Sequence, residues 1–337
     1  MKNKELDLIT FGRSSIDLYS QNIGADFIDI KGFDAFVGGS PLNIAVGASR
    51  LGAKVSLLTG VGNDKVGDFI INFLKKQNVD TGSIATIPGA RSSAVVLGIE
   101  PPDRFPLVFY RDNAADSQVT IDHVIAADIS KYRMLEISAT ALNIEPSRSA
   151  VFYAVEQAVE NNVEVLLDID FRADQWKEVR SFGLMVRALL SKVTIAIGTE
   201  EEILAATLQS ADQIEITHQQ ISAPAIKGNI EESIKKILKL GPEILIVKRG
   251  AKGATIHYKD GREQGVPGFP VEILNVLGAG DAFASGFIYG YLQGWDIYKA
   301  CRLGNASGAW VVQKPGCAND MPYYDEVMQF ADSRGGL

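Results

Sequence analysis

A glycine-rich stretch near the C-terminal end of the chain carries its strongest chemical signal. Gly278-Ala279-Gly280-Asp281 stands directly before an apolar helix predicted over residues 282–293. Small residues at a helix start let backbone N–H groups converge on an anion, with the helix dipole behind them. An acid at that point would repel a bound phosphate, but it could take a proton from a hydroxyl that attacks the phosphate. Asp281 is therefore the candidate general base, although a tight turn followed by an ordinary first-turn acid would explain the same residues.

Glycine and polar residues also follow the first predicted strand, Leu6 to Phe11. Asp17 comes soon after this strand, and Gly38-Gly39 precedes Asn43 at the entry to a helix predicted over residues 44–51, with Ser40 as its cap. The two glycines would let the backbone approach a ligand closely, and Asn43 would point toward that ligand from the first turn. A simple loop-to-helix entry explains this pattern equally well.

Charged residues stand where two further predicted strands end. Arg111 follows a strand over residues 107–110, and Asp168-Ile169-Asp170-Phe171-Arg172 follows a strand over residues 163–167. Ligands of open α/β sheets bind at this carboxyl edge. Guanidinium groups bind carboxylates bidentately, so the two arginines favour an acidic ligand. The alternatives are a solvated loop arginine for Arg111, and contact with phosphates or with Asp168 or Asp170 for Arg172.

A third glycine-bearing segment, Lys248 to Gly253, joins predicted strands over residues 244–247 and 254–258. Small residues between basic ones could accommodate nucleotide phosphates or ribose, whereas the ordinary alternative is a hairpin with exposed lysines. Thr199 and Glu202 have the spacing of a capping box at a helix start. Neither a dinucleotide fingerprint nor a Walker-type Gly-Lys-Ser/Thr motif occurs in the sequence.

The composition of the chain excludes several classes of partner. A net charge of -8 without any lysine or arginine cluster argues against nucleic acid and anionic membranes. Two cysteines without metal spacing suit a reducing compartment, and three scattered histidines make zinc improbable. No stretch approaches about 20 apolar residues, as a membrane span requires. We therefore expect a cytoplasmic protein.

From residue 121 onward, predicted strands and helices alternate as in a parallel, doubly wound sheet. Two groups of short segments, over residues 13–37 and 84–112, are predicted to form a small β-strand lid over the edge of that sheet. The first group includes an expected strand over residues 27–30, and the second includes one over residues 84–87. Residues 209–229 are predicted to be a surface insertion. Residues 1–337 are interpreted as one domain.

In this order and over nearly the whole chain, the motifs resemble those of the ribokinase-like (PfkB) carbohydrate kinases. The motifs are Gly38-Gly39 with Asn43 and Leu51-Gly52, then Val61-Gly62-Asn63-Asp64 with Gly67, and finally Gly278 to Asp281. Their combination is highly specific, although each piece alone is not. Within the family, Phe109-Tyr110-Arg111 and Asp168-x-Asp170-x-Arg172 with Trp176 resemble the kinases of acidic keto-deoxy sugars.

The resemblance implies a ribokinase-like three-layer α/β/α fold with a small β-strand lid. It also implies ATP, Mg²⁺ and phosphorylation of a primary sugar hydroxyl. The expected substrate is 5-dehydro-2-deoxygluconate, with 2-keto-3-deoxygluconate second and a neutral sugar of the fructose or ribose type as a further alternative. A non-catalytic regulator would be expected to lose the acid at Asp281, which is present.

The resemblance also assigns roles to residues. Asp281 would be the base, and the anion hole would be formed by Gly278, Ala279 and Gly280. The sugar would be bound by Asp17, Gly38, Gly39, Asn43, Arg111, Asp170 and Arg172. The nucleotide would lie along Thr199, Lys248, Gly250, Gly253 and Asn305. Glu202 would hold Mg²⁺ through water.

Four positions depart from the pattern of the family. Asn275-Val276 replaces its usual Asp-Thr, which removes a carboxylate and a hydroxyl from a region often linked to a monovalent cation and leaves activation by K⁺ in question. Thr199 stands where the family has an asparagine near the metal, and Asp170 stands where many relatives have asparagine. Exposed lid strands need covering, so a homodimer formed through the lid is expected.

Overall fold

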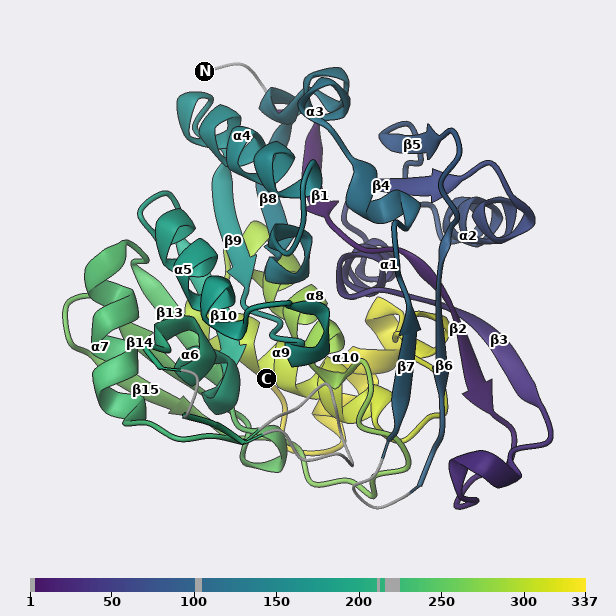
Figure 1. Cartoon of the computed structure of the whole chain (residues 1–337). Coiled ribbons are helices and arrows are strands. Elements are labelled where there is room, and N and C mark those ends of the chain that lie inside the picture. Colours follow the sequence, from purple (N-terminus) through teal and green to yellow (C-terminus); the bar gives the residue numbers. More distant parts are fainter. Residues whose placement is uncertain (1–3, 101–104, 211–212, 216–224) are drawn as a thin grey trace.

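A nine-stranded sheet forms the centre of the computed structural model, which describes residues 4–100, 105–210, 213–215 and 225–337 (Figure 1). Its strand order is β15-β14-β13-β10-β9-β8-β1-β4-β5, and only the pairings of β14 with β13 and with β15 are antiparallel. The strands are β1 (Leu6–Phe11), β4 (Val55–Gly62), β5 (Ile84–Ile87), β8 (Tyr132–Ser138), β9 (Glu164–Asp168), β10 (Ile195–Thr199), β13 (Ile244–Lys248), β14 (Ala254–Tyr258) and β15 (Glu263–Val266).

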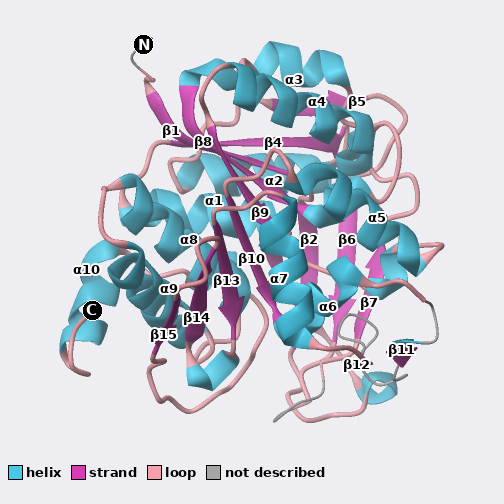
Figure 2. Ribbon diagram, turned by 90° about the vertical axis from the view of Figure 1, so that its left-hand side faces the viewer, coloured by secondary structure: helices cyan, strands magenta, loops and turns pink. Residues whose placement is uncertain are grey.

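Helices cover both faces of this sheet (Figure 2). One hydrophobic core lies under α3 (Ile121–Ala127), α4 (Ser147–Glu160), α5 (Val179–Leu190), α6 (Glu200–Thr207) and α7 (Ile230–Leu240). The core on the other face lies under α1 (Ser40–Leu51), α2 (Lys65–Lys76), α8 (Ala279–Leu292) and α9 (Ile297–Val311), and α10 (Tyr324–Asp332) packs on α9. The predicted three-layer α/β/α architecture is confirmed. None of the helices in the described ranges is long and apolar enough to cross a lipid bilayer.

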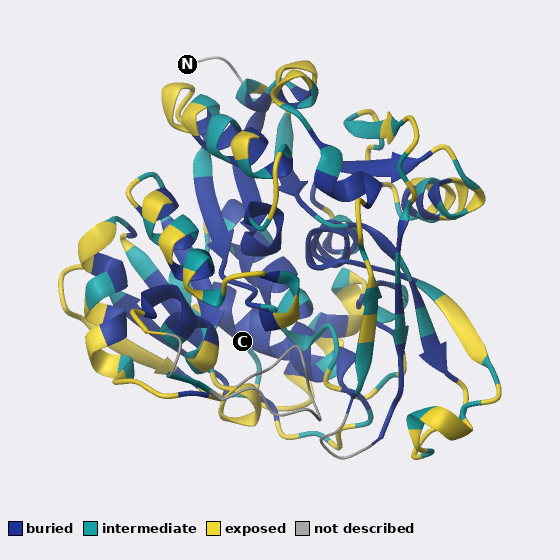
Figure 3. Ribbon diagram, viewed as in Figure 1, coloured by how far each residue is buried: buried dark blue, intermediate teal, exposed yellow. Residues whose placement is uncertain are grey.

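The central strands are apolar on both sides because both faces are covered. All eight residues of β4 are buried, and Figure 3 shows the central strands of the large sheet mostly in the buried colour. Parallel pairing aligns the strand ends: Ser138 pairs with Asp168, and Thr199 pairs with Lys248. The charged strand ends noted in the sequence therefore meet at one edge of the sheet.

A second sheet of four strands, which we call the lid, stands beside this edge in the order β3-β2-β6-β7. Its strands are β2 (Ser15–Ser20), β3 (Phe33–Gly38), β6 (Ser93–Leu97) and β7 (Leu107–Tyr110). Two details of the predicted lid are wrong. Residues 84–87 form β5 at the edge of the large sheet, where they pair with β4, and residues 27–30 contain a short 3₁₀ helix, Phe27–Asp29, instead of a strand.

The remaining boundaries differ by a few residues from those expected. Helix α5 begins at Val179, and a 3₁₀ turn, Ala173–Gln175, precedes it. Gly39, not Ser40, is the cap of α1. In the predicted insertion over residues 209–229, β11 (Ile214–Glu215) pairs with β12 (Ala225–Ile226), and residues 211–212 and 216–224 lie outside the described residues.

Candidate active site

The candidate base lies in the first turn of α8. Gly278 caps this helix with a φ of 79°, a left-handed conformation that glycine adopts without strain, and Asp281 is the third helical residue. The side-chain amide of Asn43 donates a hydrogen bond of 2.7 Å to Oδ2 of Asp281. The Oδ1 atom of Asn43 is buried and has no partner among the described residues. One oxygen of the candidate base is thus held in place, and an acceptor faces the same space.

The packing of α1 on α8 explains how Asn43 reaches Asp281. Gly47 lies one turn after Asn43, and Ser285 lies one turn after Asp281. A Cβ atom added to Gly47 would lie only 2.4 Å from Oγ of Ser285. The absence of a side chain at Gly47 therefore lets the two helices approach closely enough for the hydrogen bond above.

The side chain of Asp17, in lid strand β2, reaches over Gly38 in the neighbouring strand β3, where Gly38 pairs with Ser15. A Cβ atom on Gly38 would lie 1.9 Å from Oδ2 of Asp17, so only glycine leaves room for that carboxylate. Ser15 donates a hydrogen bond of 2.6 Å to the other oxygen, Oδ1. Burial raises the pKa of Asp17, and the charge of Arg13 and the hydrogen bond from Ser15 partly offset this effect.

A lysine and two acids meet where β9, β10 and β13 end. Lys248 Nζ lies 3.3 Å from Oδ1 of Asp168 and 3.7 Å from Oε2 of Glu202. Burial lowers the pKa of Lys248, but the charges of Asp168 and Glu202 outweigh burial and raise it overall. Burial, only partly offset by Lys248, raises the pKa of Asp168 to about 7. A Cβ atom on Gly280 would lie 3.2 Å from Lys248 Nζ, so this cation reaches the start of α8.

Thr199 and Glu202 form the capping box expected from their spacing. Glu202 Oε2 accepts a hydrogen bond of 2.7 Å from the backbone N–H of Thr199, and Thr199 Oγ1 accepts one of 3.3 Å in return. Glu202 thus has a structural role at the start of α6, and its carboxylate also lies beside Lys248. Within the described ranges, no three His, Cys, Asp or Glu side chains gather as a ready-made metal site.

The structure explains why an acid stands at position 170, where many relatives have asparagine. Its Oδ1 forms an ion pair of 2.8 Å with Arg172, and its Oδ2 accepts a hydrogen bond of 2.8 Å from Ser138. These partners outweigh burial and hold the pKa of Asp170 below its usual value. Its backbone φ is 25°, which is uncommon for a residue with a side chain and indicates a position fixed by its surroundings. Asp170 therefore orients Arg172.

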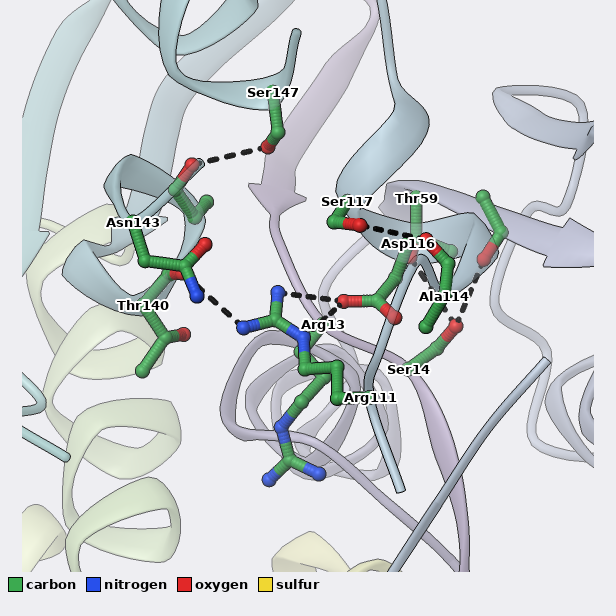
Figure 4. A network of polar contacts seen from close by, with 12 residues as sticks. Arg13, Ser14, Thr59, Arg111, Ala114, Asp116, Ser117, Thr140, Asn143 and Ser147 are labelled. Atoms are coloured by element: carbon green, nitrogen blue, oxygen red, sulfur yellow. Dashed lines mark hydrogen bonds and ion pairs between the residues drawn. The ribbon is translucent and has the colours of Figure 1, made fainter. Parts of the chain in front are cut away.

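Arg111 is held by protein groups rather than facing an open site (Figure 4). It forms an ion pair of 2.6 Å with Asp116, and its Nη1 donates to Gln175 and Thr140. Its side chain is 6% exposed and that of Asp116 is 0% exposed. The sequence suggested a carboxylate of the ligand as the partner of Arg111, but here that position is filled by Asp116.

A cavity of about 310 Å³ lies beside the first turn of α8, which carries Asp281. All five residues expected to bind nucleotide contribute to its wall, together with Ala279 and Gly280; the five are Thr199, Lys248, Gly250, Gly253 and Asn305. Much of the remaining wall is apolar and includes Phe269, Ile273, Val276 and Phe283. Sequence reasoning assigned none of these apolar residues to the site: Val276 was noted only as a departure from the family pattern, and the others lie in loops and helices without a recognisable motif.

Two asparagines hold the loops around this cavity. The Nδ2 atom of Asn305 donates to the backbone oxygens of Val266 and Pro267. Asn275 is fully buried; its Nδ2 donates to Pro315 O at 2.8 Å, and its Oδ1 accepts from the backbone N–H of Leu277 at 3.0 Å. The amide that replaces the usual carboxylate of the family is therefore engaged in shaping the loop before α8.

Sequence reasoning overlooked two charged residues at this edge. Arg13 follows β1, and its Nη1 donates a hydrogen bond of 2.8 Å to Ser15 Oγ. Glu136, in β8, is 0% exposed, and neither carboxylate oxygen has a partner among the described residues. Burial, together with the charges of Asp168 and Asp281, raises its pKa well above the usual value. The position of Arg13 after a strand resembles that of the charged strand ends and could have identified it; Glu136 lies inside an apolar strand and gave no signal.

Comparisons with known proteins agree on the family. The model of the pfkB family carbohydrate kinases matches residues 6–323. A 5-dehydro-2-deoxygluconokinase of Clostridium perfringens is 32% identical over 330 residues, which cover 98% of this chain and 94% of that protein. A protein described as ribokinase II from E. coli, solved in complex with ATP and Mg²⁺, has a TM-score of 0.84 at 23% identity, covering 97% of this chain and 99% of its own. A fructokinase double mutant from Vibrio cholerae was solved with fructose, ADP and potassium ion. It has a TM-score of 0.81 at 24% identity, and the match covers 98% of this chain and 99% of the fructokinase chain.

Proposed function

Since the chain belongs to the pfkB family and is a carbohydrate kinase, we propose that it transfers the γ-phosphoryl group of ATP to the primary hydroxyl of 5-dehydro-2-deoxy-D-gluconate, forming the 6-phosphate. The observation that carries this proposal is the position of Asp281, with one oxygen held by Asn43. The apolar-walled cavity reaches the neighbouring residues Ala279 and Gly280, and the charge of Asp281 acts on Asp17, which lies against Gly38. The choice of sugar is supported by the name of the relative from Clostridium perfringens.

In the proposed reaction, Asp281 accepts the proton of the sugar hydroxyl as that oxygen attacks phosphorus. Transfer of a phosphoryl group passes through a loose transition state, so the protein contributes mainly alignment and charge stabilisation. The N–H groups at the start of α8 and the ammonium of Lys248 face the same point and would stabilise the charge of the moving group. Asp17 and the free Oδ1 of Asn43 would accept hydrogen bonds from sugar hydroxyls.

The carboxylates beside Lys248 fit a role in holding Mg²⁺. Mg²⁺ keeps several waters and is usually bound by one or two carboxylates together with substrate phosphates. Burial, together with the charges of Glu202 and Asp170, raises the pKa of Asp168 to about 7, and this grouping of acids favours a cation at this point. We propose that Glu202, with Asp168 beside it, holds the metal through water. Mg²⁺ would neutralise charge on the phosphates of ATP.

We propose that turnover does not require K⁺. A K⁺ ion needs oxygen ligands, whereas Asn275 presents its amide nitrogen to Pro315 O and uses its oxygen for Leu277, and Val276 has no oxygen in its side chain. Initial rates should be equal within about two-fold when K⁺ replaces tetramethylammonium at constant ionic strength. A larger activation by K⁺ would show that other oxygens serve as ligands.

We propose that the lid closes over the sugar and also forms a homodimer contact. Large apolar side chains are exposed on the lid and its connections: Ile23 (52%), Ile28 (90%), Phe33 (37%), Val108 (42%) and Tyr110 (62%). Figure 3 shows exposed stretches on β3 and β7. Pairing of two lids would cover this surface. Sedimentation at micromolar concentration tests the assembly, and a monomer at that concentration would contradict it.

A panel of sugars tests the proposed substrate. Release of ADP should be fastest with 5-dehydro-2-deoxygluconate and slower with 2-keto-3-deoxygluconate, fructose and ribose. Preference for a neutral hexose would overturn the proposal of an acidic substrate while leaving the kinase activity intact.

A cytoplasmic location is also proposed, because both cysteines are unpaired and ATP is the co-substrate.

A further inference from the structure

Three arginines lie near the proposed sugar site, and their existing partners differ. Arg111 is paired with buried Asp116 and donates to two further oxygens. Arg172 is paired with Asp170. Arg13 donates one hydrogen bond to the neutral hydroxyl of Ser15, and no carboxylate in the described part of the chain forms an ion pair with it. Of the three, Arg13 is the guanidinium whose charge is not matched by an acid in direct contact.

The backbone of Arg13 is held against the loop that carries the other sugar residues. It directly follows β1 at the carboxyl edge of the large sheet. A Cβ atom added to Gly39 would lie 2.3 Å from the carbonyl oxygen of Arg13, so the two backbones are in close contact. Its Nη1 also binds Ser15, which binds Asp17. Arg13 therefore lies next to Asp17 in space as well as in sequence.

The side chain of Arg13 also reaches the lid. Its guanidinium lies 5.2 Å from the centre of the Phe109 ring, in strand β7. Figure 4 shows that this guanidinium points away from the Arg111–Asp116 pair. Burial raises the pKa values of Asp17 and Asp174, and the charge of Arg13 partly offsets this rise. The same charge adds to Arg172 and Ser138 in holding the pKa of Asp170 low, which supports a position among these acids. Arg13 therefore lies between the body of the enzyme and its lid.

We propose that Arg13 binds the carboxylate of the sugar acid and thereby sets the preference for an acidic substrate. This inference rests on the proposed function. The hydroxyl that receives phosphate must lie at Asp281, and in 5-dehydro-2-deoxygluconate the carboxylate is at the opposite end of the carbon chain. Arg172 lies toward the phosphoryl end, since Glu202, Asp168 and Asp281 act on its charge. Arg13 is linked to Asp17 through Ser15 and lies against Phe109 of the lid, where the other end of the sugar would reach it.

A carboxylate at this point would make charge-assisted hydrogen bonds with the unused N–H groups of Arg13. Such bonds have a defined geometry, because the planar guanidinium presents paired donors to the two oxygens. The face of Phe109 would shield the pair from water when the lid is closed, which strengthens the attraction. The residue thus links recognition of the acid to closure of the lid.

The test compares an acid with a neutral sugar in matched variants. Wild type, Arg13→Gln, Arg13→Lys and Ser15→Ala are assayed with 5-dehydro-2-deoxygluconate and with fructose, and dissociation constants of both sugars are measured by calorimetry. Arg180→Gln, which removes an arginine exposed on α5, is the control. Arg13→Gln should lower kcat/KM for the acid roughly 10- to 150-fold, mainly through KM, and change binding and turnover of fructose by less than about three-fold.

The other variants separate recognition from positioning. Ser15→Ala keeps the guanidinium but removes its link to Asp17, so it should affect the two sugars by similar factors. Arg13→Lys keeps the charge without the paired donors and should retain part of the preference. If circular dichroism shows that Arg13→Gln is unfolded, the test rests on Arg13→Lys and on its ratio of kcat/KM for the acid to kcat/KM for fructose. Equal losses for both sugars would overturn the inference, because Arg13 would then only position Asp17. Failure of the wild type to phosphorylate the acid would instead overturn the proposed function.

Discussion

Asn43 and Asp281 are joined by a hydrogen bond of 2.7 Å although 238 positions separate them in the sequence. The amide holds Oδ2 of the carboxylate, which leaves Oδ1 to accept a proton. The contact also joins the first turns of α1 and α8, so two separate glycine-bearing motifs meet at one point. General base, anion hole and sugar-binding amide are thereby positioned by one pair of packed helices.

Replacement of the base is the most direct test of this arrangement. Asp281→Asn should keep the fold and the binding of both substrates, since an asparagine oxygen can still accept from Asn43. Its kcat should fall on the order of 10² or more, as removal of a positioned base generally causes. Steady-state turnover and nucleotide binding by calorimetry would be measured together. Near-normal turnover with intact binding would sink the assignment of Asp281.

A second prediction concerns the close approach of the two helices. Gly47→Ala places a methyl group against Ser285, so α1 and α8 must separate and the Asn43–Asp281 hydrogen bond must lengthen. Overpacking of this kind typically costs about 1–3 kcal/mol of stability, and misplacement of the base should lower kcat about ten-fold or more. Gly265→Ala is the matched control, because space around Gly265 in β15 is open. Equal activity of the two variants would contradict the prediction.

A third prediction concerns the role of Arg111. Arg111→Met leaves the buried carboxylate of Asp116 without its partner, so the protein should lose roughly 3–5 kcal/mol of stability. The double variant Arg111→Met with Asp116→Leu removes both charges and should recover much of that loss. The free energy of unfolding of the single and the double variant is measured by urea denaturation. An Arg111→Met enzyme of normal stability that has lost its preference for the acid would instead support direct binding of the substrate by Arg111.

Glu136 gives a prediction about pH. Its pKa is raised in the native state, so the native protein binds this proton more tightly than the unfolded chain. Stability is therefore fully present below the unfolded pKa, near 4.3, and falls as pH rises toward the native pKa, by up to about 1.4 kcal/mol per pH unit. Glu136→Gln removes this dependence. Its melting temperature should exceed that of wild type by a margin that grows as the pH rises above 5. Parallel melting curves across this range would show that Glu136 titrates normally.

The sequence by itself determined the layer architecture and the family. Alternation of apolar strands and helices from residue 121 onward requires a covered parallel sheet, and such a sheet aligns the ends of its strands. The residues expected at those ends, among them Asp168 and Lys248, accordingly lie together at one edge, and the charge of Asp281 at the start of α8 acts on Asp168. Local rules also predicted the capping box of Thr199 and Glu202, because its two partners lie within one helical turn.

Only the tertiary structure decided which charges are neutralised by other parts of the protein. Arg111 and Arg172 look alike in the sequence as arginines after strands, yet Arg111 pairs with buried Asp116 whereas Arg172 is oriented by strained Asp170. The membership of β5 in the large sheet was likewise decided by pairing with β4, since a short apolar segment fits either sheet. The physical reason is the same in each case. Ion pairs and strand pairing depend on distances between groups far apart in the chain, and local sequence patterns do not determine those distances.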